Sequence, residues 1–375
     1  MRFAQGVTDQ FDEHAADTAS ALRSLLSREK LIAQAAMESE QDSPDKSYDS
    51  AQKIFTPTSL AEALSLWSML PTAQLVAGGT DKGLEVTQQL TRWTTVIHLS
   101  ELSELKAIEH HAEKLVVGAG VSISEFLNTL SLDYPDAVPM LLRFGSEQVR
   151  SQATVGGNLG TASPIGDLAP LLLALGASIT LVSLNSDSQG LNSRSILIAD
   201  YFTGYRQTLR AQNEWIQSIS IPLPEQTDIL RVYKVSKRMD DDISSVCAAI
   251  WLRIDSVNTP ATVTDVRLGF GGMAETPRRA KAAEAALHDA FVNDETIKAA
   301  CAALCEDFQP IDDARASADY RQRIAANLLR RFFIEFENLN AQGSGQSNKQ
   351  GNDKHSHQAK DRVEQLTNIA DVVRG

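Results

Sequence analysis

Two glycine-containing segments have the residue types best suited to binding an anion. The first, residues 75–81, reads LVAGGTD, and the second, residues 153–167, contains ATVGGN and ASPIGD. Adjacent glycines let a backbone approach a bulky anion and adopt positive φ. Thr154, Asn158 and Thr161 add hydroxyl and amide groups that can bond a pyrophosphate. We therefore expect two strand-led turns that hold one phosphate-bearing ligand from two sides.

Neither segment matches the common nucleotide-binding motifs. Both lack Gly-x-Gly-x-x-Gly, and neither contains Gly-Lys-Ser/Thr. Taken singly, each segment is also compatible with a β-turn whose glycines serve geometry alone, because glycine is a common turn residue. The pairing of the two segments is what favours ligand binding.

A run of charges and an aromatic patch are further candidates. Lys234, Lys237 and Arg238 precede three aspartates at 240–242. This run is either a solvated turn, or its basic residues meet a cofactor ring or phosphate while its acidic residues gate a second substrate. The patch YFTGYR at 201–206 is either a stacking surface or a domain seam. Because no Ser–His–Asp order, HExxH motif or paired-histidine site appears, a cofactor would have to supply any reaction.

Composition excludes several classes of protein. The 375 residues carry a formal charge of −13, which disfavours a nucleic-acid surface. No segment approaches the roughly 18 apolar residues of a membrane span. The polar, acidic N-terminus does not resemble a secretory signal, so we expect a cytoplasmic protein. Three cysteines, Cys247, Cys301 and Cys305, cannot supply the four thiolates of an iron–sulfur cluster.

The pattern along the chain predicts two α+β units between a prelude and a tail. Residues 1–50 read as a helical segment, 11–37, followed by an acidic linker. A first domain spans 51–224, and a second, 225–338, groups its strands before its helices, which is typical of an α+β domain. Residues 339–375 read as a flexible tail with a short helix at 361–373.

Capping patterns and hydrophobic runs place the expected elements. Ser59–x–x–Glu62 and Ser122–x–x–Glu125 are capping boxes that begin helices, and Asp167 opens a buried helix that ends at Gly176. The other expected helices lie at 137–144, 278–287, 295–306 and 318–337. Strands are expected at 75–77, 95–99, 115–117, 179–183, 215–221, 230–235, 244–254 and 264–270, with a polar hairpin at 185–192.

Four ordered blocks, at 75–82, 144–167, 204–206 and 234–242, together resemble the flavoprotein subunit or domain of the molybdenum hydroxylases, most closely the xanthine dehydrogenases. The resemblance runs from about Phe55 to about Phe336. It implies an FAD-binding domain of the vanillyl-alcohol-oxidase type and a smaller α+β domain like the C-terminal domain of CO dehydrogenase flavoproteins. It also implies that electrons from purine oxidation at a molybdenum centre reach FAD through iron–sulfur clusters and leave as hydride to NAD⁺.

The same resemblance implies roles for individual residues. Residues 75–82 would hold the FAD diphosphate and approach the isoalloxazine, Phe144 would pack on the adenine side, and Ile216 would cover a flavin face. Lys234 would reach the flavin's polar edge, and the 235–245 loop would flank the NAD site. The implied FAD-binding residues are Leu75, Val76, Ala77, Gly78, Gly79, Thr80, Asp81, Lys82, Phe144, Thr154, Gly157, Asn158, Thr161, Asp167, Ile216 and Lys234.

Departures from the family pattern leave two alternatives open. Complete members bind two [2Fe–2S] clusters through eight cysteines, so here the clusters and the molybdopterin are expected on partner chains or in a missing region. Lys82 stands where an apolar residue is common and Gly166 where a hydroxyl is common, which changes the expected flavin environment. The alternatives are a self-contained FAD oxidase acting on a small alcohol or sugar, and a truncated subunit without turnover.

Overall fold

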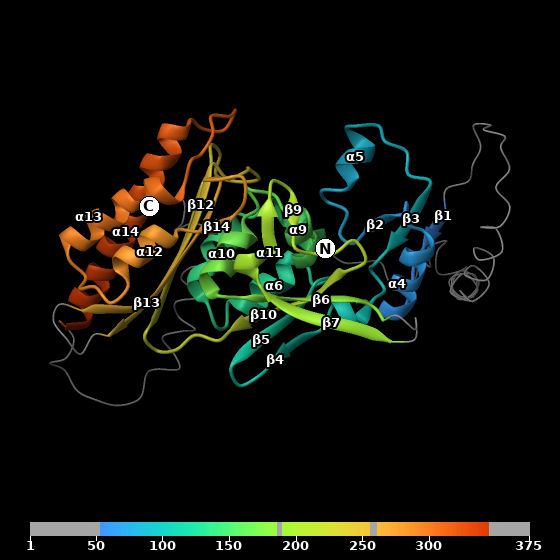
Figure 1. The fold of residues 1–375 in the computed structure, drawn as a ribbon, viewed down its shortest axis with the longest axis horizontal. Helices are drawn as coiled ribbons and strands as arrows, with labels where there is room; N and C mark the ends of the chain where they lie inside the picture. Colours follow the sequence, from blue (N-terminus) through green and yellow to red (C-terminus); the bar gives the residue numbers. More distant parts are fainter. Residues whose placement is uncertain (1–52, 186–189, 256–260, 345–375) are drawn as a thin grey trace, which may run out of the picture.

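The computed structural model describes residues 53–344, apart from 186–189 and 256–260. Its first part is a small lobe, residues 53–99, which lies at the right of Figure 1. A parallel sheet forms this lobe, in the order β1 (Lys53–Phe55), β3 (Thr95–His98) and β2 (Gln74–Val76). Helix α4 (Leu60–Met69) packs on the sheet, and the short helix α5 (Gly83–Thr87) follows β2. The lobe has a core of its own around Phe55, Leu66 and Ile97.

The second part is built on a five-stranded antiparallel sheet. Its order is β4 (Ile108–His110), β5 (Lys114–Gly118), β10 (Trp215–Pro222), β6 (Ser178–Leu184) and β7 (Leu191–Leu197). The associated helices lie mostly above this sheet in Figure 1. They are η1 (Ser103–Leu105), α6 (Ile123–Leu130), η2 (Pro135–Ala137), α7 (Val138–Leu142), α8 (Glu147–Gln152), α9 (Val155–Gly160), α10 (Leu168–Leu175) and α11 (Ile198–Tyr201). A small hairpin, β8 (Phe202–Gly204) and β9 (Gln207–Thr208), follows α11.

The third part is an antiparallel sheet covered by helices on one face and by α10 on the other (Figure 1). Its strands are β11 (Asp228–Val235), β12 (Val246–Asp255), β13 (Thr262–Gly271) and β14 (Arg278–Arg279). Its helices are α12 (Lys281–Leu287), α13 (Asp294–Asp307) and α14 (Ala318–Ser344).

Strand β12 shows how this arrangement arises from sequence. Successive side chains of a strand point to opposite faces, and β12 is buried on both. Ala248 and Ile250 join the core under the C-terminal helices, whereas Ala249 and Trp251 join the core that contains α10. An apolar run without alternation is therefore what this strand requires.

The capping signals in the sequence are confirmed. Ser122 and Glu125 form a reciprocal capping box at the start of α6, and the Ser59 hydroxyl accepts the Glu62 amide at 3.3 Å at the start of α4. Gly176 ends α10 with φ of 67°, in the left-handed region that glycine adopts most readily. Both units contain sheets as well as helices, which agrees with the expected α+β class.

The second glycine segment differs from its prediction. It is not a strand-led turn, because it follows helix α8 and itself forms helix α9. Thr154 caps this helix by accepting the Gly157 amide at 3.1 Å, and a Cβ on Gly156 would lie 2.5 Å from the Ala119 Cβ. Gly156 and Gly157 also have no positive φ, unlike Gly79 in the first segment. Capping and close packing thus outweigh the low helix propensity of glycine.

Several short or exposed strands were also missed. Strands β1, β4, β7, β8 and β9 were not expected, and β14 occupies the start of the predicted helix 278–287. Strand β7 is almost entirely exposed and rich in Ser, Asn and Arg, so it lacks the apolar alternation that identifies a strand. The predicted helix 137–144 is shorter, with α7 preceded by the 3₁₀ turn η2. The prelude 1–50 and the helix 361–373 lie outside the described residues.

Among the helices in the described ranges, none has the long apolar run that crossing a membrane requires.

We expect Gly269→Ala to destabilise the fold because β13 and α10 are in backbone contact there. A Cβ at Gly269 would lie 2.2 Å from the Pro170 carbonyl oxygen, and overpacking of this kind costs about 1–3 kcal/mol. Chemical denaturation should show that loss. Gly83→Ala is the matched control, because no atom lies within 4 Å of its added Cβ. Equal stability of the two variants would contradict the close packing.

Candidate cofactor-binding cleft

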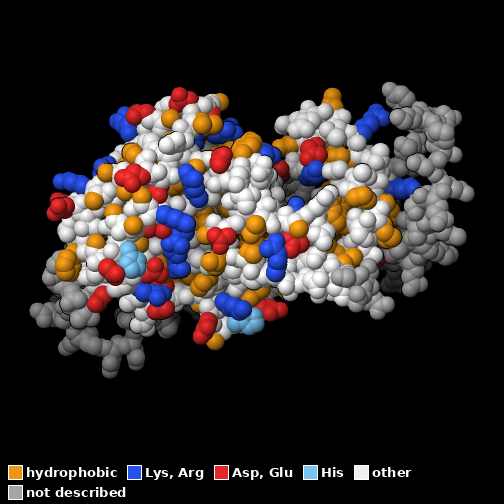
Figure 2. Space-filling model, viewed as in Figure 1, with side chains coloured by type: hydrophobic (Ala, Val, Ile, Leu, Met, Phe, Trp, Pro, Cys, Tyr) orange, Lys and Arg blue, Asp and Glu red, His pale blue; other side chains and the backbone are white. Residues whose placement is uncertain are grey.

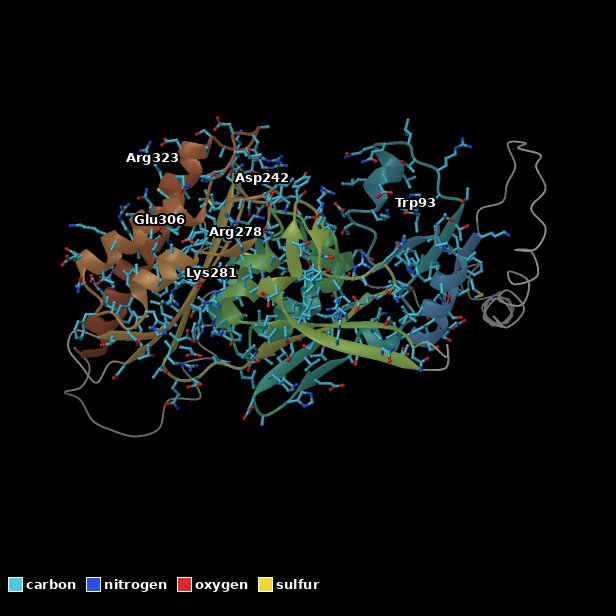
Figure 3. All side chains as sticks on the ribbon, viewed as in Figure 1. Trp93, Asp242, Arg278, Lys281, Glu306 and Arg323 are labelled. Carbon is cyan, nitrogen blue, oxygen red and sulfur yellow. The ribbon has the colours of Figure 1, made fainter. Side chains whose placement is uncertain are left out.

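A cleft of about 880 Å³ separates the small lobe from the rest of the molecule. The loop between β2 and α5 forms one wall, and α9, the start of α10 and β11 form the other. Figure 2 shows a hollow at the top of the molecule, between the small lobe and the central elements. In Figure 3, Trp93 marks the small lobe and Asp242 lies across the hollow from it.

The first glycine segment contributes a loop with free backbone donors. Gly79 has φ of 72°, and Gly78 lies so close to the end of α8 that a Cβ there would come 1.8 Å from the Gln152 carbonyl oxygen. The amides of Gly78, Gly79, Thr80 and Asp81 donate no hydrogen bond to another described residue. Successive free amides in such a turn form an anion-binding concavity.

The second glycine segment presents bare backbone to the same cleft. Gly157 and Gly160 of α9 both line it. A Cβ on Gly160 would meet a single neighbour, the Ile216 Cδ1 at 4.0 Å. The Thr161 hydroxyl donates to the Asn158 carbonyl at 2.8 Å. A ligand can therefore approach the α9 backbone more closely than it could approach a helix with side chains.

A buried ion pair lies at the base of the cleft, where the second and third parts of the chain meet. The Lys234 ammonium of β11 donates to Asp167 Oδ2 at 2.7 Å, and the two side chains are 1% and 8% exposed. Asp167 Oδ1 accepts the Ser244 hydroxyl at 2.5 Å. Burial, and then the Asp167 carboxylate, raise the pKa of the neighbouring Cys247 thiol. That thiol therefore stays protonated and Asp167 remains the partner of Lys234.

Arg143 joins the loop after β11 to the cleft wall. Its guanidinium donates to the Lys234 carbonyl at 2.6 Å, to the Ser236 hydroxyl at 2.8 Å and to the Met239 carbonyl at 3.1 Å. In return, the Lys234 ammonium donates to the Arg143 carbonyl at 2.9 Å. The loop 236–243 is thereby held at the rim, where Asp241 has a positive φ of 46°.

All but one of the residues predicted for the site lie together in the structure. Those that line this one cleft are Leu75, Ala77, Gly78, Gly79, Thr80, Asp81, Lys82, Phe144, Thr154, Gly157, Asn158, Thr161, Asp167, Ile216 and Lys234. Val76 is the exception: it is the last residue of β2 and does not line the cleft, although its strand neighbour Leu75 does. Lys234 also differs from the solvated-turn interpretation, since it belongs to a strand and is buried.

Lys82 has its charge engaged within the small lobe. Its ammonium lies 2.7 Å from Glu85 Oε1 and 5.8 Å from the centre of the Trp93 ring. Trp93 Nε1 donates to the other Glu85 oxygen at 3.3 Å. The hydrogen bond from Lys82 is the main reason that the pKa of Glu85 is lowered. The unusual lysine therefore adds an internal ion pair to this wall.

Sequence reasoning missed several residues that line the cleft. Trp67 and Trp215 contact each other edge to face, with ring centroids 6.2 Å apart, and both reach the cleft from different parts of the chain. Arg206 and Arg210 also line it. Arg206 was noted within an aromatic patch, but nothing local to the sequence placed that patch beside the glycine segments.

Comparison with protein families assigns the two parts that form the cleft. The family model for the FAD binding domain in molybdopterin dehydrogenase matches residues 48–224, and that for the CO dehydrogenase flavoprotein C-terminal domain matches residues 231–336. The two matches together span more than half of the chain. The chain therefore contains an FAD binding domain of the molybdopterin dehydrogenase type, followed by a CO dehydrogenase flavoprotein C-terminal domain.

Similar proteins extend this family assignment. Xanthine dehydrogenase of Emericella nidulans is 31% identical over 296 residues, which are 75% of this chain and 21% of that protein. Nicotinate hydroxylase of the same organism is 31% identical over 305 residues, 76% of this chain and 22% of that protein. The chain thus spans about a fifth of the length of these relatives.

Solved structures show the same fold. Carbon monoxide dehydrogenase from Hydrogenophaga pseudoflava matches with a TM-score of 0.68 and 24% identity, over 75% of this chain and 95% of that chain. Quinoline 2-oxidoreductase from Pseudomonas putida 86 matches with a TM-score of 0.66 and 24% identity, over 76% of this chain and 96% of that chain.

We expect Lys234→Met to destabilise the protein because it leaves the Asp167 carboxylate buried without its counter-ion. Breaking one side of a buried pair costs about 3–5 kcal/mol, measurable by urea denaturation. The double variant Asp167→Leu/Lys234→Met should lose less than the sum of the two single losses, because no unpaired charge remains. Arg323→Met is the control, since its pair with Asp319 is exposed and such pairs contribute about 1 kcal/mol or less. Additive losses would contradict the coupling.

Proposed function

We propose that this chain binds FAD in the cleft, with the diphosphate against the loop 77–82. The observation that carries the proposal is the run of free amides from Gly78 to Asp81 in a loop that lines the cleft. Backbone amides are suitable partners for a diphosphate because they direct several partial positive charges at one anion. The family of the first domain, which is defined by FAD binding, supports the same ligand.

The residues present fit a large dinucleotide in shape and chemistry. A cleft of about 880 Å³ lies in the upper part of the usual range for ligand sites, roughly 300–1,000 Å³. A Cβ on Gly79 or Gly160 would have no protein atom closer than 3.6 Å, so the backbone there leaves space for a ligand. Phe144 and Ile216 provide apolar surface, and Thr154, Asn158 and Asp167 provide polar groups.

Bound FAD would supply reversible two-electron, hydride-transfer chemistry. Phe144 would pack on the adenine side, and Ile216, which is 8% exposed, would cover a flavin face. Lys234 would keep a fixed positive charge at the flavin's polar edge, where a preorganised cation stabilises developing negative charge. Asp167 and the Arg143 carbonyl hold that ammonium in place.

The wider function that we propose is electron transfer within a xanthine dehydrogenase-like molybdenum hydroxylase in the cytoplasm. Electrons from purine oxidation would reach the flavin through iron–sulfur clusters and a molybdopterin-binding subunit, both outside this chain, and would leave to NAD⁺ beside the 235–245 loop. The xanthine dehydrogenase relatives support this substrate class. The hydroxylase of nicotinate is similar to the same degree, so an aromatic N-heterocycle is the shared chemistry.

Gly157→Val tests the cofactor. A Cβ at Gly157 would lie 2.7 Å from Thr154 Oγ1, which disrupts the cap of α9 and places a side chain on the cleft side. We expect the wild-type chain to bind FAD and the variant to bind it at least about tenfold more weakly, a difference of about 1.4 kcal/mol. Fluorescence titration measures the affinity, and circular dichroism checks the fold. Full FAD affinity in a folded variant would reject the proposed site.

The electron-transfer role predicts which half-reaction this chain performs alone. The flavin-loaded chain should oxidise NADH with an artificial dye as electron acceptor and should not oxidise xanthine. Its three cysteines cannot ligate the clusters that would connect it to a molybdenum centre. Steady-state assays with each donor measure both outcomes. Direct oxidation of a small alcohol or sugar would favour a self-contained oxidase, and FAD binding without any turnover would favour a non-catalytic subunit.

A further inference from the structure

Arg321 is a fully buried guanidinium behind the cleft wall, outside the residues that line the cleft. It lies on α14, and its side chain is 2% exposed. One terminal nitrogen donates to the carbonyls of Ser245, at 2.5 Å, and Gly272, at 2.8 Å. The other donates to Asp313 Oδ1 at 2.6 Å. Its Nε has no hydrogen-bond partner among the described residues.

Both carbonyls belong to backbone that leads directly to the cleft. Ser245 follows Ser244, whose hydroxyl donates to Asp167. Gly272 donates its own amide to the Pro164 carbonyl at 2.8 Å. Pro164 and Asp167 bound the short stretch that includes the cleft residues Ile165 and Gly166. A single guanidinium therefore holds two separate backbone segments that support the same part of the wall.

The backbone at Gly272 packs closely against this guanidinium. Gly272 has φ of 79°, and a Cβ there would lie 2.3 Å from the Ser245 carbonyl oxygen and 3.0 Å from Arg321 Nη1. Arginine suits such a position because its planar group can bond several acceptors at once, whereas a lysine ammonium is a single point of charge.

Asp313 keeps the guanidinium paired and connects it to the cleft rim. Burial alone would raise the pKa of Asp313, but the amides of Ala316 and Arg315 together with Arg321 lower it to about 2. The carboxylate is thus ionised at neutral pH. Lys237, in the rim loop 236–243, donates to the Ala314 carbonyl at 2.7 Å. The segment beside Asp313 therefore also contacts the rim.

We propose that Arg321 is a positioning residue for the flavin cleft. It fixes Ser245 and Gly272, and through them it holds Asp167 in the geometry that keeps the Lys234 ammonium at the base of the cleft. The inference rests on the proposed function for the identity of the ligand, FAD. The effect of Arg321 on the wall of the cleft is a property of the chain alone and can be measured without FAD.

Cys247 gives a readout that needs no cofactor. It is buried two residues after Ser245, and its sulfur lies 3.9 Å from the Asp167 carbonyl oxygen. In a Cys301→Ala/Cys305→Ala background it is the remaining cysteine. We expect Arg321→Met to speed reaction of Cys247 with an aromatic disulfide reagent by about tenfold or more, because local opening of the wall exposes the thiol. Arg321→Lys and Asp313→Asn should give intermediate rates.

Two controls separate this role from general destabilisation. Leu304→Ala removes core packing at a buried residue of α13 that does not line the cleft. Its rate should be compared under conditions in which it and Arg321→Met have the same free energy of unfolding. Arg323→Met alters an exposed arginine on the same helix, labelled on the outer side of α14 in Figure 3. Neither control should expose Cys247 to the same degree.

FAD titration completes the experiment. Arg321→Met should weaken FAD binding on the order of tenfold, in line with the loss of residues that hold ligand-binding side chains in metal sites, and it should shift the midpoint potential of bound FAD. Failure of the wild-type chain to bind FAD would reject the proposed function and leave the Cys247 result to decide the positioning role. Protection of Cys247 in Arg321→Met equal to that in Leu304→Ala would overturn the inference.

Discussion

The buried pair of Asp167 and Lys234 is the interaction on which the arrangement of the cleft depends. Asp167 begins helix α10 of the second part, and Lys234 lies on strand β11 of the third. Moving two charges out of water is costly, so a buried pair persists only where further hydrogen bonds satisfy both groups. Ser244 and the Arg143 carbonyl provide those bonds. The two parts of the chain can therefore meet in this register and still leave no unpaired charge.

A second constraint acts between the small lobe and the second part. The backbone at Gly78 lies against the Gln152 carbonyl so closely that any side chain would clash. A β-carbon cannot be accommodated without moving one lobe relative to the other, since both atoms involved belong to backbone. The backbone of the first glycine segment is thus fixed against the end of α8 and the start of the second segment.

The sequence predicts those elements whose signals are local. The capping box at Ser122, the N-cap at Ser59 and the glycine that ends α10 are each confirmed at the expected position, although the Glu62 carboxylate accepts from the Thr58 amide and not from Ser59. Strand β7 was missed because an exposed edge strand needs no apolar alternation. The second glycine segment was read as a turn because glycine has a low helix propensity, whereas Thr154 and the close contact with Ala119 make it a helix.

In the candidate site, too, local features could be predicted from the sequence and long-range contacts could not. Residues that would touch a ligand could be anticipated because glycines, hydroxyls and a lysine occur in recognisable blocks, and all but Val76 line one cleft. The residues that hold these ligand-facing groups in place could not be predicted, because each is distant in sequence from the residue that it contacts. Ser244 and Asp167 are 77 residues apart, and Arg321 and Ser245 are 76 residues apart. A carbonyl that accepts from a buried guanidinium leaves no trace in residue type. Local motifs therefore indicate which chemical groups line the cleft. The geometry of those groups depends on contacts between residues that are distant in sequence and meet only when the chain folds.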